Sequence, residues 1–242
     1  MKNKVTELDE ILKVFQDGQC ILFGDWHGEL SAEEVITGIL EKGVKDIDAV
    51  AVSGGMADQG VGRLIVANRV KSLKTTHIGL NPICKDKMVA GELDIEFIPQ
   101  GTFTERIRCG GYGLGGCLTK TGLGTEVAEG KQIVTIKGED YVVEEAIHGD
   151  VSLIKAEKGD KFGNLRFKLT SRAIGKQLAL AGDICVAEVE ELVDVLDPDD
   201  IDVPAPVVDM IYVRKGEKKP FCPMWQRAKA KAEAKAAEGG KK

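Results

Sequence analysis

The hydrophobic residues of this chain form short blocks whose spacing alternates between that of strands and that of helices. Residues 20–24 (CILFG) and 47–52 (IDAVAV) are largely apolar runs of strand length, which is typical of strands that are covered on both faces. Between them, residues 31–34 (SAEE) form a capping box ahead of apolar positions at helical spacing, and Gly43 ends that pattern. The first fifty residues therefore predict a unit of strand, helix and strand.

The same alternation continues along the chain. Thr6 is expected to cap a first helix that stops at Asp17-Gly18. Further helices are expected at 63–70, 83–90 and 172–181, and further strands at 72–78, 93–98, 151–156, 165–169, 184–189 and 207–213. Elements in this order predict parallel strands joined by right-handed crossovers. The fold class is therefore α/β, with a mostly parallel sheet flanked by helices.

One further pair of strand-like segments has a different spacing. Residues 132–136 and 141–145 flank a short turn at Gly138-Glu139. Two such runs joined by a tight turn are typical of a hairpin. We expect this hairpin to be added to the main sheet.

The middle of the chain is rich in glycine. Within residues 98–131, glycine occupies positions 101, 110, 111, 113, 115, 116, 122, 124 and 130. A short helix at 102–108 should end at Gly110-Gly111, and the residues after it are expected to form no regular element. On composition alone, two interpretations stay open. The segment is either a set of surface turns or a binding wall whose backbone N–H groups face an anionic ligand.

Composition sets limits on the class of protein. The chain has 242 residues, of which 43% are hydrophobic and 30% charged, as in a soluble globular protein. A net charge of −6 argues against nucleic-acid binding, and no apolar run approaches the roughly 20 residues of a membrane span. The six cysteines show no C-x-x-C spacing, so we expect reduced thiols and no metal site. The first residues do not resemble a signal peptide, and we expect a cytoplasmic protein.

The composition changes near the C-terminus. Residues 1–219 are interpreted as one domain, and residues 220–242 as a tail rich in Ala, Lys and Glu. The tail has hardly any apolar face, so an isolated helix there is marginal. Phe221, Met224 and Trp225 are an exception, and we expect this apolar cluster to dock on the body or on a neighbouring subunit.

The glycine-rich segment carries the clearest resemblance to known proteins. Residues 99–131 contain the pattern PQGTxxERIRCGG…GLGG…TxTGxGTxVxEGK, which resembles the centre of the A (alpha) subunit of family I CoA-transferases of the acetate or acetoacetate type. Further matches in the same order extend the resemblance from about residue 17 to about residue 213. The resemblance implies a CoA-transferase-like α/β fold.

The resemblance also implies an activity and a partner. The chain would be one subunit of a hetero-oligomer, with two A and two B (beta) chains, that moves CoA from a short acyl-CoA to a short carboxylate. Coenzyme A would be a substrate, and no permanently bound cofactor is expected. The family's nucleophile is a glutamate in a Ser-Glu-Asn-Gly-type motif on the B subunit, and no such tetrapeptide occurs here. Glu105 and Glu126 are not expected to replace it, so no catalytic residue is assigned to this chain.

The carboxyl ends of the predicted strands mark the candidate binding residues, because open α/β sheets bind ligands there. In the resembled subunit, the loop after the first strand is a glycine-rich CoA loop. Here Asp25 and Glu29 replace small or apolar residues, and they would repel CoA phosphates unless paired. The candidates for CoA or acyl binding are Gly24, Asp25, Trp26, His27, Gly28, Glu29, Leu30, Ser53, Gly54, Gly55 and Gln100.

Several of these residues allow two interpretations. His27 and Asp25 are either an acid–base pair or a structural hydrogen-bonding pair. Trp26 either caps an acyl pocket or fills the core. The amides of Gly54-Gly55 either line the acyl site or form a tight turn. Gln100 matches the glutamine of the family's PQGT, and its amide is suited to orient a carboxylate or thioester oxygen.

Two alternative functions remain at this point. A CoA-thioester hydrolase or ring-opening enzyme on the same scaffold would fit the altered loops at 25–30 and 53–54. A sugar-phosphate isomerase or sensor of similar architecture is the other alternative, and the PQGT…TGxGT match argues against it.

Overall fold

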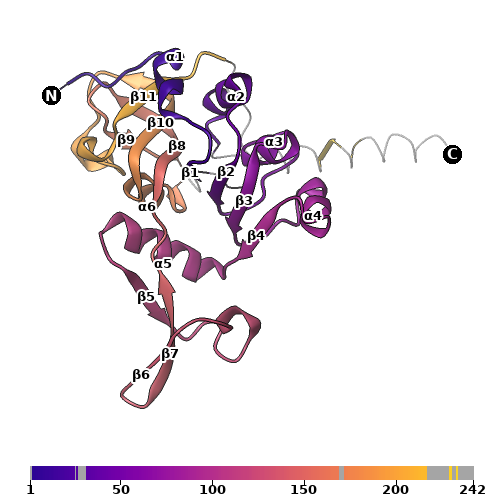
Figure 1. Cartoon of the computed structure of the whole chain (residues 1–242). Helices are drawn as coiled ribbons and strands as arrows, with labels where there is room; N and C mark the ends of the chain where they lie inside the picture. The colour runs from indigo at the N-terminus through magenta and orange to yellow at the C-terminus, as the bar shows by residue number, and fades with distance from the viewer. Residues whose placement is uncertain are drawn as a thin grey trace.

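The computed structural model describes residues 2–24, 26, 31–168, 172–216, 229–230 and 233. Its main sheet has the strand order β11-β10-β8-β1-β2-β3-β4, with all neighbours in that series parallel, and β9 pairs antiparallel with β8 (Figure 1). The strands are β1 (Cys20–Phe23), β2 (Ile47–Ala51), β3 (Val70–Thr75), β4 (Asp94–Phe97), β8 (Gly149–Asp160), β9 (Leu165–Arg166), β10 (Gly182–Val193) and β11 (Met210–Val213). The predicted α/β class with a mostly parallel sheet is confirmed.

Helices cover both faces of this sheet. They are α1 (Leu8–Ile11), α2 (Glu33–Lys42), α3 (Val61–Val66), α4 (Pro82–Val89), α5 (Gln100–Gly111) and α6 (Gly175–Leu180), with short 3₁₀ turns at Leu12–Val14, Glu126–Ala128, Pro198–Asp200 and Ala205–Val207. In one buried cluster, helices α1, α2, α3 and α4 pack against one face of the sheet. In a second cluster, α5 and α6 pack against the other face. The chain therefore forms a three-layer structure.

Strand β1 shows why its sequence is a continuous apolar run. Ile21 and Phe23 point into the cluster under α1 to α4, whereas Leu22 points into the cluster under α5 and α6. All three side chains are at most 1% exposed. Because successive side chains of a strand point to opposite faces, a strand in the middle layer needs apolar residues at every position.

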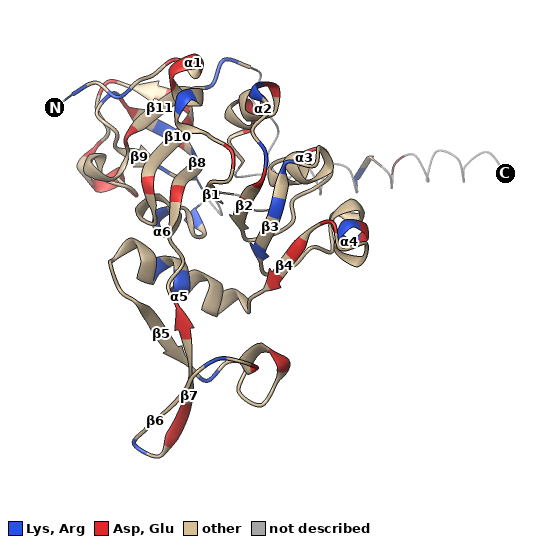
Figure 2. Ribbon diagram, in the orientation of Figure 1, with Lys and Arg blue, Asp and Glu red and all other residues tan. Residues whose placement is uncertain are grey.

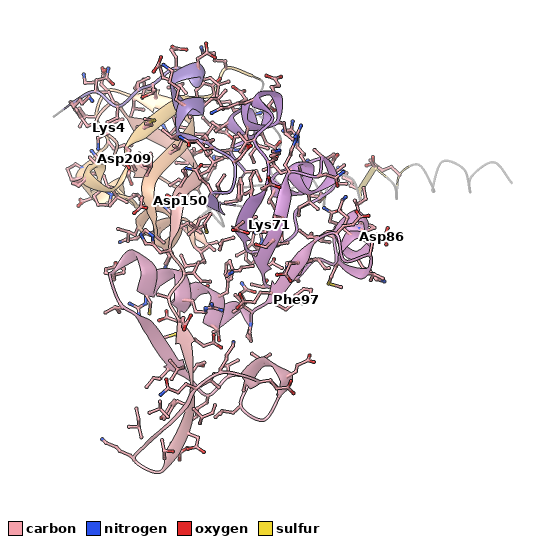
Figure 3. The ribbon with its side chains drawn as sticks, viewed as in Figure 1. Lys4, Lys71, Asp86, Phe97, Asp150 and Asp209 are labelled. Atoms are coloured by element: carbon pink, nitrogen blue, oxygen red, sulfur yellow. The ribbon has the colours of Figure 1, made fainter. Side chains whose placement is uncertain are left out.

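Side-chain hydrogen bonds join neighbouring strands of the sheet. The Asp150 carboxylate, at the start of β8, accepts the N–H of Cys20 at 2.7 Å (Figure 3). Asp209, just before β11, accepts the N–H of Cys185 at 2.8 Å. Nearby, the Lys4 Nζ donates to the carbonyl oxygens of Ala205 and Val208. These two carboxylates therefore have structural roles within the sheet.

The predicted hairpin forms, but it does not join the main sheet. Strands β6 (Ile133–Ile136) and β7 (Glu139–Glu145) pair antiparallel, and Lys137 and Gly138 between them have φ of 52° and 82°. Positive φ at both turn residues is what a two-residue hairpin requires. Strand β7 also pairs with β5 (Gly116–Thr119), and the three strands form a separate sheet that projects beyond α5 (Figure 1).

The prediction for the glycine-rich segment was wrong in one respect, because strand β5 is a regular element within it. The predicted end of the helix is confirmed, since Gly110 and Gly111 are the last two residues of α5. A Cβ on Gly110 would lie 2.0 Å from the carbonyl oxygen of Ile147, and one on Gly111 would lie 2.7 Å from the Cβ of Leu180. These glycines allow close packing of α5 against the chain before β8 and against α6.

The two predicted N-terminal caps were also wrong. Glu7, not Thr6, precedes α1, and Thr6 donates its hydroxyl to the Lys4 carbonyl. Ala32 precedes α2 and makes no side-chain cap, so Ser31 does not complete a capping box. The predicted C-terminal stop is confirmed, because Gly43 ends α2 with a left-handed φ of 82°.

An ion-paired arginine connects the small sheet to the body. Arg106 of α5 lies 2.6 Å from the Glu96 carboxylate of β4 and 3.6 Å from that of Glu144 in β7. Its Nε donates to the carbonyl oxygen of Glu145 at 2.7 Å. Figure 2 shows basic residues of α5 between acidic residues of β4 and β7. The guanidinium is mostly buried, so its pairing with these acids fixes where the small sheet leaves the body.

The C-terminal tail lies almost entirely outside the described residues. This includes the Phe221, Met224 and Trp225 cluster and the whole of residues 217–228.

Candidate active site

The carboxyl edge of the sheet brings several predicted site residues to one side of the molecule. Gly24 directly follows β1, and Ser53 follows β2, the next strand of the sheet. Gln100 follows β4, which lies three strands from β1 at the edge of the sheet. Strands in a sheet are about 4.8 Å apart, so the β1 and β4 axes are roughly 14 Å apart.

Gly24 lies where the chain leaves β1 against β8. Its N–H donates to the Leu153 carbonyl at 2.8 Å, and a Cβ there would lie 3.2 Å from the Cα of Ile154. Trp26 is partly buried and packs against the core cluster under α5 and α6. The other predicted residues of this loop, Asp25, His27, Gly28, Glu29 and Leu30, lie outside the described residues.

The loop after β2 is closely packed and internally hydrogen-bonded. Ser53 is 1% exposed, and its hydroxyl accepts the N–H of Gly55 at 3.2 Å. The N–H of Gly54 donates to the His77 carbonyl at 3.0 Å, and the Asn81 amide donates to the Gly54 carbonyl at 3.0 Å. Because the N–H groups of Gly54 and Gly55 already donate to His77 and Ser53, the loop offers a ligand its shape and not these two donors.

Gln100 is the first residue of α5 and is exposed. Pro99, which precedes this helix, makes no side-chain cap, and the N–H groups of a first helical turn have no partners within the helix. The glutamine amide therefore stands beside backbone donors at the carboxyl edge of the sheet. This position is compatible with the predicted contact to a carboxylate or thioester oxygen.

The family model for coenzyme A transferase matches residues 5–214, which span the whole α/β body. The chain belongs to the coenzyme A transferase family. It is 41% identical over 220 residues to the alpha subunit of the acetate CoA-transferase of Escherichia coli (strain K12), covering 90% of this chain and 100% of the relative. It is equally 41% identical over 220 residues to the corresponding subunit of the succinyl-CoA:3-ketoacid coenzyme A transferase of Helicobacter pylori (strain J99), covering 90% of this chain and 94% of the relative.

A solved structure supports the same fold. The acyl-CoA transferase of E. coli O157:H7, in a thioester complex with CoA, superposes with a TM-score of 0.78 at 20% identity. The match covers 91% of this CoA-transferase chain and 49% of the other chain. The predicted family, fold and enzyme class are thus confirmed, and the chain is of the A (alpha) type.

The glutamates of the central segment have structural positions in this CoA-transferase subunit. The Glu105 carboxylate lies 2.8 Å from Arg108 in the next turn of α5, as expected of a helix ion pair. Glu126 begins a short 3₁₀ turn after β5. The predicted exclusion of these residues as nucleophiles stays a prediction.

The described cysteines are free thiols, and burial raises the pKa of four of them, namely Cys20, Cys84, Cys117 and Cys185. Burial raises the pKa of the Cys84 thiol to about 11 and that of Cys185 to about 12. Neither is a ready nucleophile at neutral pH. Within the described ranges, no cluster of His, Cys, Asp or Glu is suited to hold a metal ion, and no helix is long and apolar enough to cross a membrane.

Glu33 also shapes the site, although it is not among the residues predicted from the sequence. This side chain is 4% exposed and accepts the N–H of Gly60, at the end of the loop after β2, at 2.7 Å. It also forms an ion pair with Arg63 at 2.9 Å. Local sequence presents Glu33 only as an acid in the first turn of α2, because its partners lie some thirty residues further along the chain.

The backbone of the loop after β2 leaves no room for a side chain at position 62, which can be tested by substitution of Gly62. A Cβ at this position would lie 2.0 Å from the Met56 carbonyl oxygen, which belongs to the backbone and has little freedom to move. We expect Gly62→Ala to lower the unfolding free energy by about 3 kcal/mol and the melting temperature by roughly 6–10 °C. Thermal unfolding followed by circular dichroism measures this.

Gly79→Ala is the matched control for that substitution. Gly79 lies after β3 near the same edge, and a Cβ there meets nothing within 4 Å. The Gly79→Ala protein should have a melting temperature within about 2 °C of that of the unsubstituted protein. Equal melting of the Gly62→Ala protein and this control would contradict the close backbone approach at Gly62.

Proposed function

We propose that this subunit works with a B subunit to move CoA from a short-chain acyl-CoA to a carboxylate of the acetate, butyrate or acetoacetate type. The 41% identity over the full length of the alpha subunit of an acetate CoA-transferase carries this proposal. The assembly contains two A and two B chains and works in the cytoplasm. Its substrates are acyl-CoA and a short carboxylate, with CoA exchanged between them and no other cofactor.

In this proposal the two chains divide the chemistry. The B subunit supplies a glutamate carboxylate that attacks the acyl-CoA thioester, which forms an acyl-glutamyl anhydride and expels the CoA thiolate. The thiolate then attacks the glutamyl carbonyl of the anhydride, which releases the donor carboxylate and leaves a glutamyl-CoA thioester. The acceptor carboxylate takes up CoA by the same two steps in reverse. The A subunit supplies the loop at 24–30 for CoA and the loop at 53–55 for the shape of the acyl pocket. Gln100 orients the reacting carbonyl or carboxylate oxygen, which is a task suited to an amide that both donates and accepts.

The altered loops at 25–30 and 53–54 favour one competing function, a CoA-thioester hydrolase on the same scaffold. The two functions differ in whether CoA reaches a carboxylate or is released to water. With A and B chains combined, we expect CoA transfer to acetate or butyrate to exceed thioester loss without acceptor by at least about 100-fold, a difference of about 2.7 kcal/mol in activation free energy.

The measurement follows acyl-CoA species by chromatography and free thiol by a colorimetric reagent in the same samples. Acetoacetyl-CoA and succinyl-CoA serve as donors, each with and without a carboxylate acceptor. Release of free CoA at the same rate with and without the acceptor would contradict the transferase and establish the hydrolase.

A further inference from the structure

A buried carboxylate from a strand distant in sequence caps the amino end of α2. Glu188 lies in β10 and is 0% exposed. Its Oε2 accepts the N–H of Glu34 at 2.9 Å and that of Val35 at 3.1 Å. The first N–H groups of a helix have no partners within it, and a negative charge there is favoured by the helix dipole. Glu188 thus replaces the local cap that α2 lacks.

The carboxylate of Glu188 is buried, and burial of its negative charge costs free energy. Burial raises the pKa of Glu188 to about 7, although the two backbone N–H groups and the nearby Arg214 act to lower it. Glu188 Oε1 has no hydrogen-bond partner among the described residues. A carboxylate buried only for stability is readily replaced by an apolar side chain, so its presence points to a requirement for the position of α2.

The first turn of α2 holds three parts of the molecule together. Glu33 accepts the N–H of Gly60 in the loop after β2. Glu34 accepts the Tyr212 hydroxyl of β11 at 2.8 Å and the N–H of Gly216 at 2.7 Å. Glu188 ties the same turn to β10. A shift of this turn would therefore move the loop at 53–60 relative to the central strands.

The register of the sheet places Glu188 on the candidate binding edge. Phe23 in β1 is level with Leu153 in β8, which is level with Val186 in β10. Glu188 comes two residues later, about 6.6 Å further toward the carboxyl edge. It thus lies level with the start of the loop at 24–30, and α2 begins just after that loop.

We propose that Glu188 is a positioning residue for CoA transfer: by fixing the amino end of α2, it fixes the loop at 53–60, which Glu33 of that helix contacts. The inference rests on the proposed function in one respect, namely that the loop at 53–60 contacts the CoA thioester. Glu188 itself does not contact substrate.

Two substitutions of Glu188 distinguish the role of its hydrogen-bond acceptor oxygen from the role of its negative charge. Glu188→Leu keeps the approximate size and removes the acceptor, whereas Glu188→Gln keeps an acceptor oxygen and removes the charge. In the complex of A and B chains, we expect Glu188→Leu to raise the KM for acyl-CoA about tenfold with kcat changed less than about threefold, as expected for lost uniform binding. Glu188→Gln should restore most of the affinity.

Glu191→Gln is the matched control. Glu191 lies on the same strand, its side chain is 49% exposed, and it pairs with Lys158 at 3.1 Å. Exposed pairs of this kind contribute little, so this variant should keep the original KM and melting temperature. Hydrogen exchange of the backbone amides of residues 33–38 in the complex tests the cap in the absence of substrate. The exchange rate should increase about tenfold or more in Glu188→Leu and should not change in Glu191→Gln.

The pH dependence of stability gives a second, independent measurement. Because the pKa of Glu188 is raised to about 7 in the folded protein, its contribution to stability is full below about pH 4.5 and is lost as the pH rises through 7. Glu188→Gln lacks that loss, so its melting temperature should rise relative to the original protein between pH 5.5 and 8.5. The charged and titratable groups beside Glu188 are Glu34, Arg214, Tyr212, Lys155 and Glu190, and they are the same in both proteins.

Three outcomes decide the inference. An unchanged KM for acyl-CoA in an assembled Glu188→Leu complex would overturn it, as would unchanged exchange of residues 33–38. If Glu188→Leu fails to assemble, a melting difference between Glu188→Gln and the original protein that does not vary with pH would overturn it. An unsubstituted complex without transferase activity would instead contradict the proposed function, and the exchange experiment would still test the cap.

Discussion

The purified chain should show no CoA transfer by itself, and activity should appear on mixing with a B chain. The physical reason is that the covalent route needs a carboxylate nucleophile, and this chain contains no Ser-Glu-Asn-Gly motif. The central glutamates are placed otherwise, since Glu105 is ion-paired with Arg108 on α5. We expect the rate of acetyl or acetoacetyl exchange to rise from background by at least about 10⁴-fold on mixing.

The assay measures transfer of CoA to labelled acetate by the A chain, the B chain and their mixture. Size-exclusion chromatography of the same samples reports whether a complex forms, and light scattering gives its stoichiometry. Robust exchange by the A chain alone would contradict the division of labour. A mixture that assembles and stays inactive would contradict the proposed activity.

Gln100→Ala should reduce turnover by about 10²–10³-fold, which is the usual effect of removing one preorganised donor from a reacting oxygen. The side chain is exposed at the start of α5, so its loss should leave the fold intact. We therefore expect unchanged assembly and a melting temperature within about 2 °C of the original protein. The effect should fall mainly on kcat, because the contact is made in the transition state.

Gln132→Ala is the matched control for this substitution. Gln132 is also exposed but precedes β6 in the small sheet, away from the carboxyl edge of the main sheet. Its removal should leave turnover within about twofold. A near-normal rate for Gln100→Ala in an intact complex would show that Gln100 belongs to the scaffold.

Equal identity to two relatives limits what overall similarity says about the substrate. The chain is 41% identical both to a subunit of an acetate CoA-transferase and to a subunit of a succinyl-CoA:3-ketoacid transferase. A pocket discriminates between such acyl groups through a few contacts. The comparison of acetoacetyl-CoA and succinyl-CoA as donors therefore tests acyl-group specificity, which we assign to the loops at 24–30 and 53–55 and not to the fold.

The sequence by itself determined the layers of the fold. Runs such as that of β1 are apolar at every position because alternate side chains enter opposite cores, and this need is visible within four residues. The end of α2 at Gly43 was also predictable, because the residue after a helix often needs a positive φ, which glycine adopts without strain. The family resemblance also came from sequence, through a motif that lies within a single continuous segment.

Only the tertiary structure decided the contacts that join distant segments. The cap of α2 comes from Glu188, which is 154 residues after Glu34, so a local capping box suggested the wrong residue. Gly110 lies at the predicted end of its helix, but the local sequence did not show that its missing Cβ makes room for the Ile147 carbonyl. The hairpin was recognisable, but its pairing with β5 was not. Local patterns record what a residue requires of its own backbone and neighbours, whereas a long-range partner is chosen by where the whole chain places it.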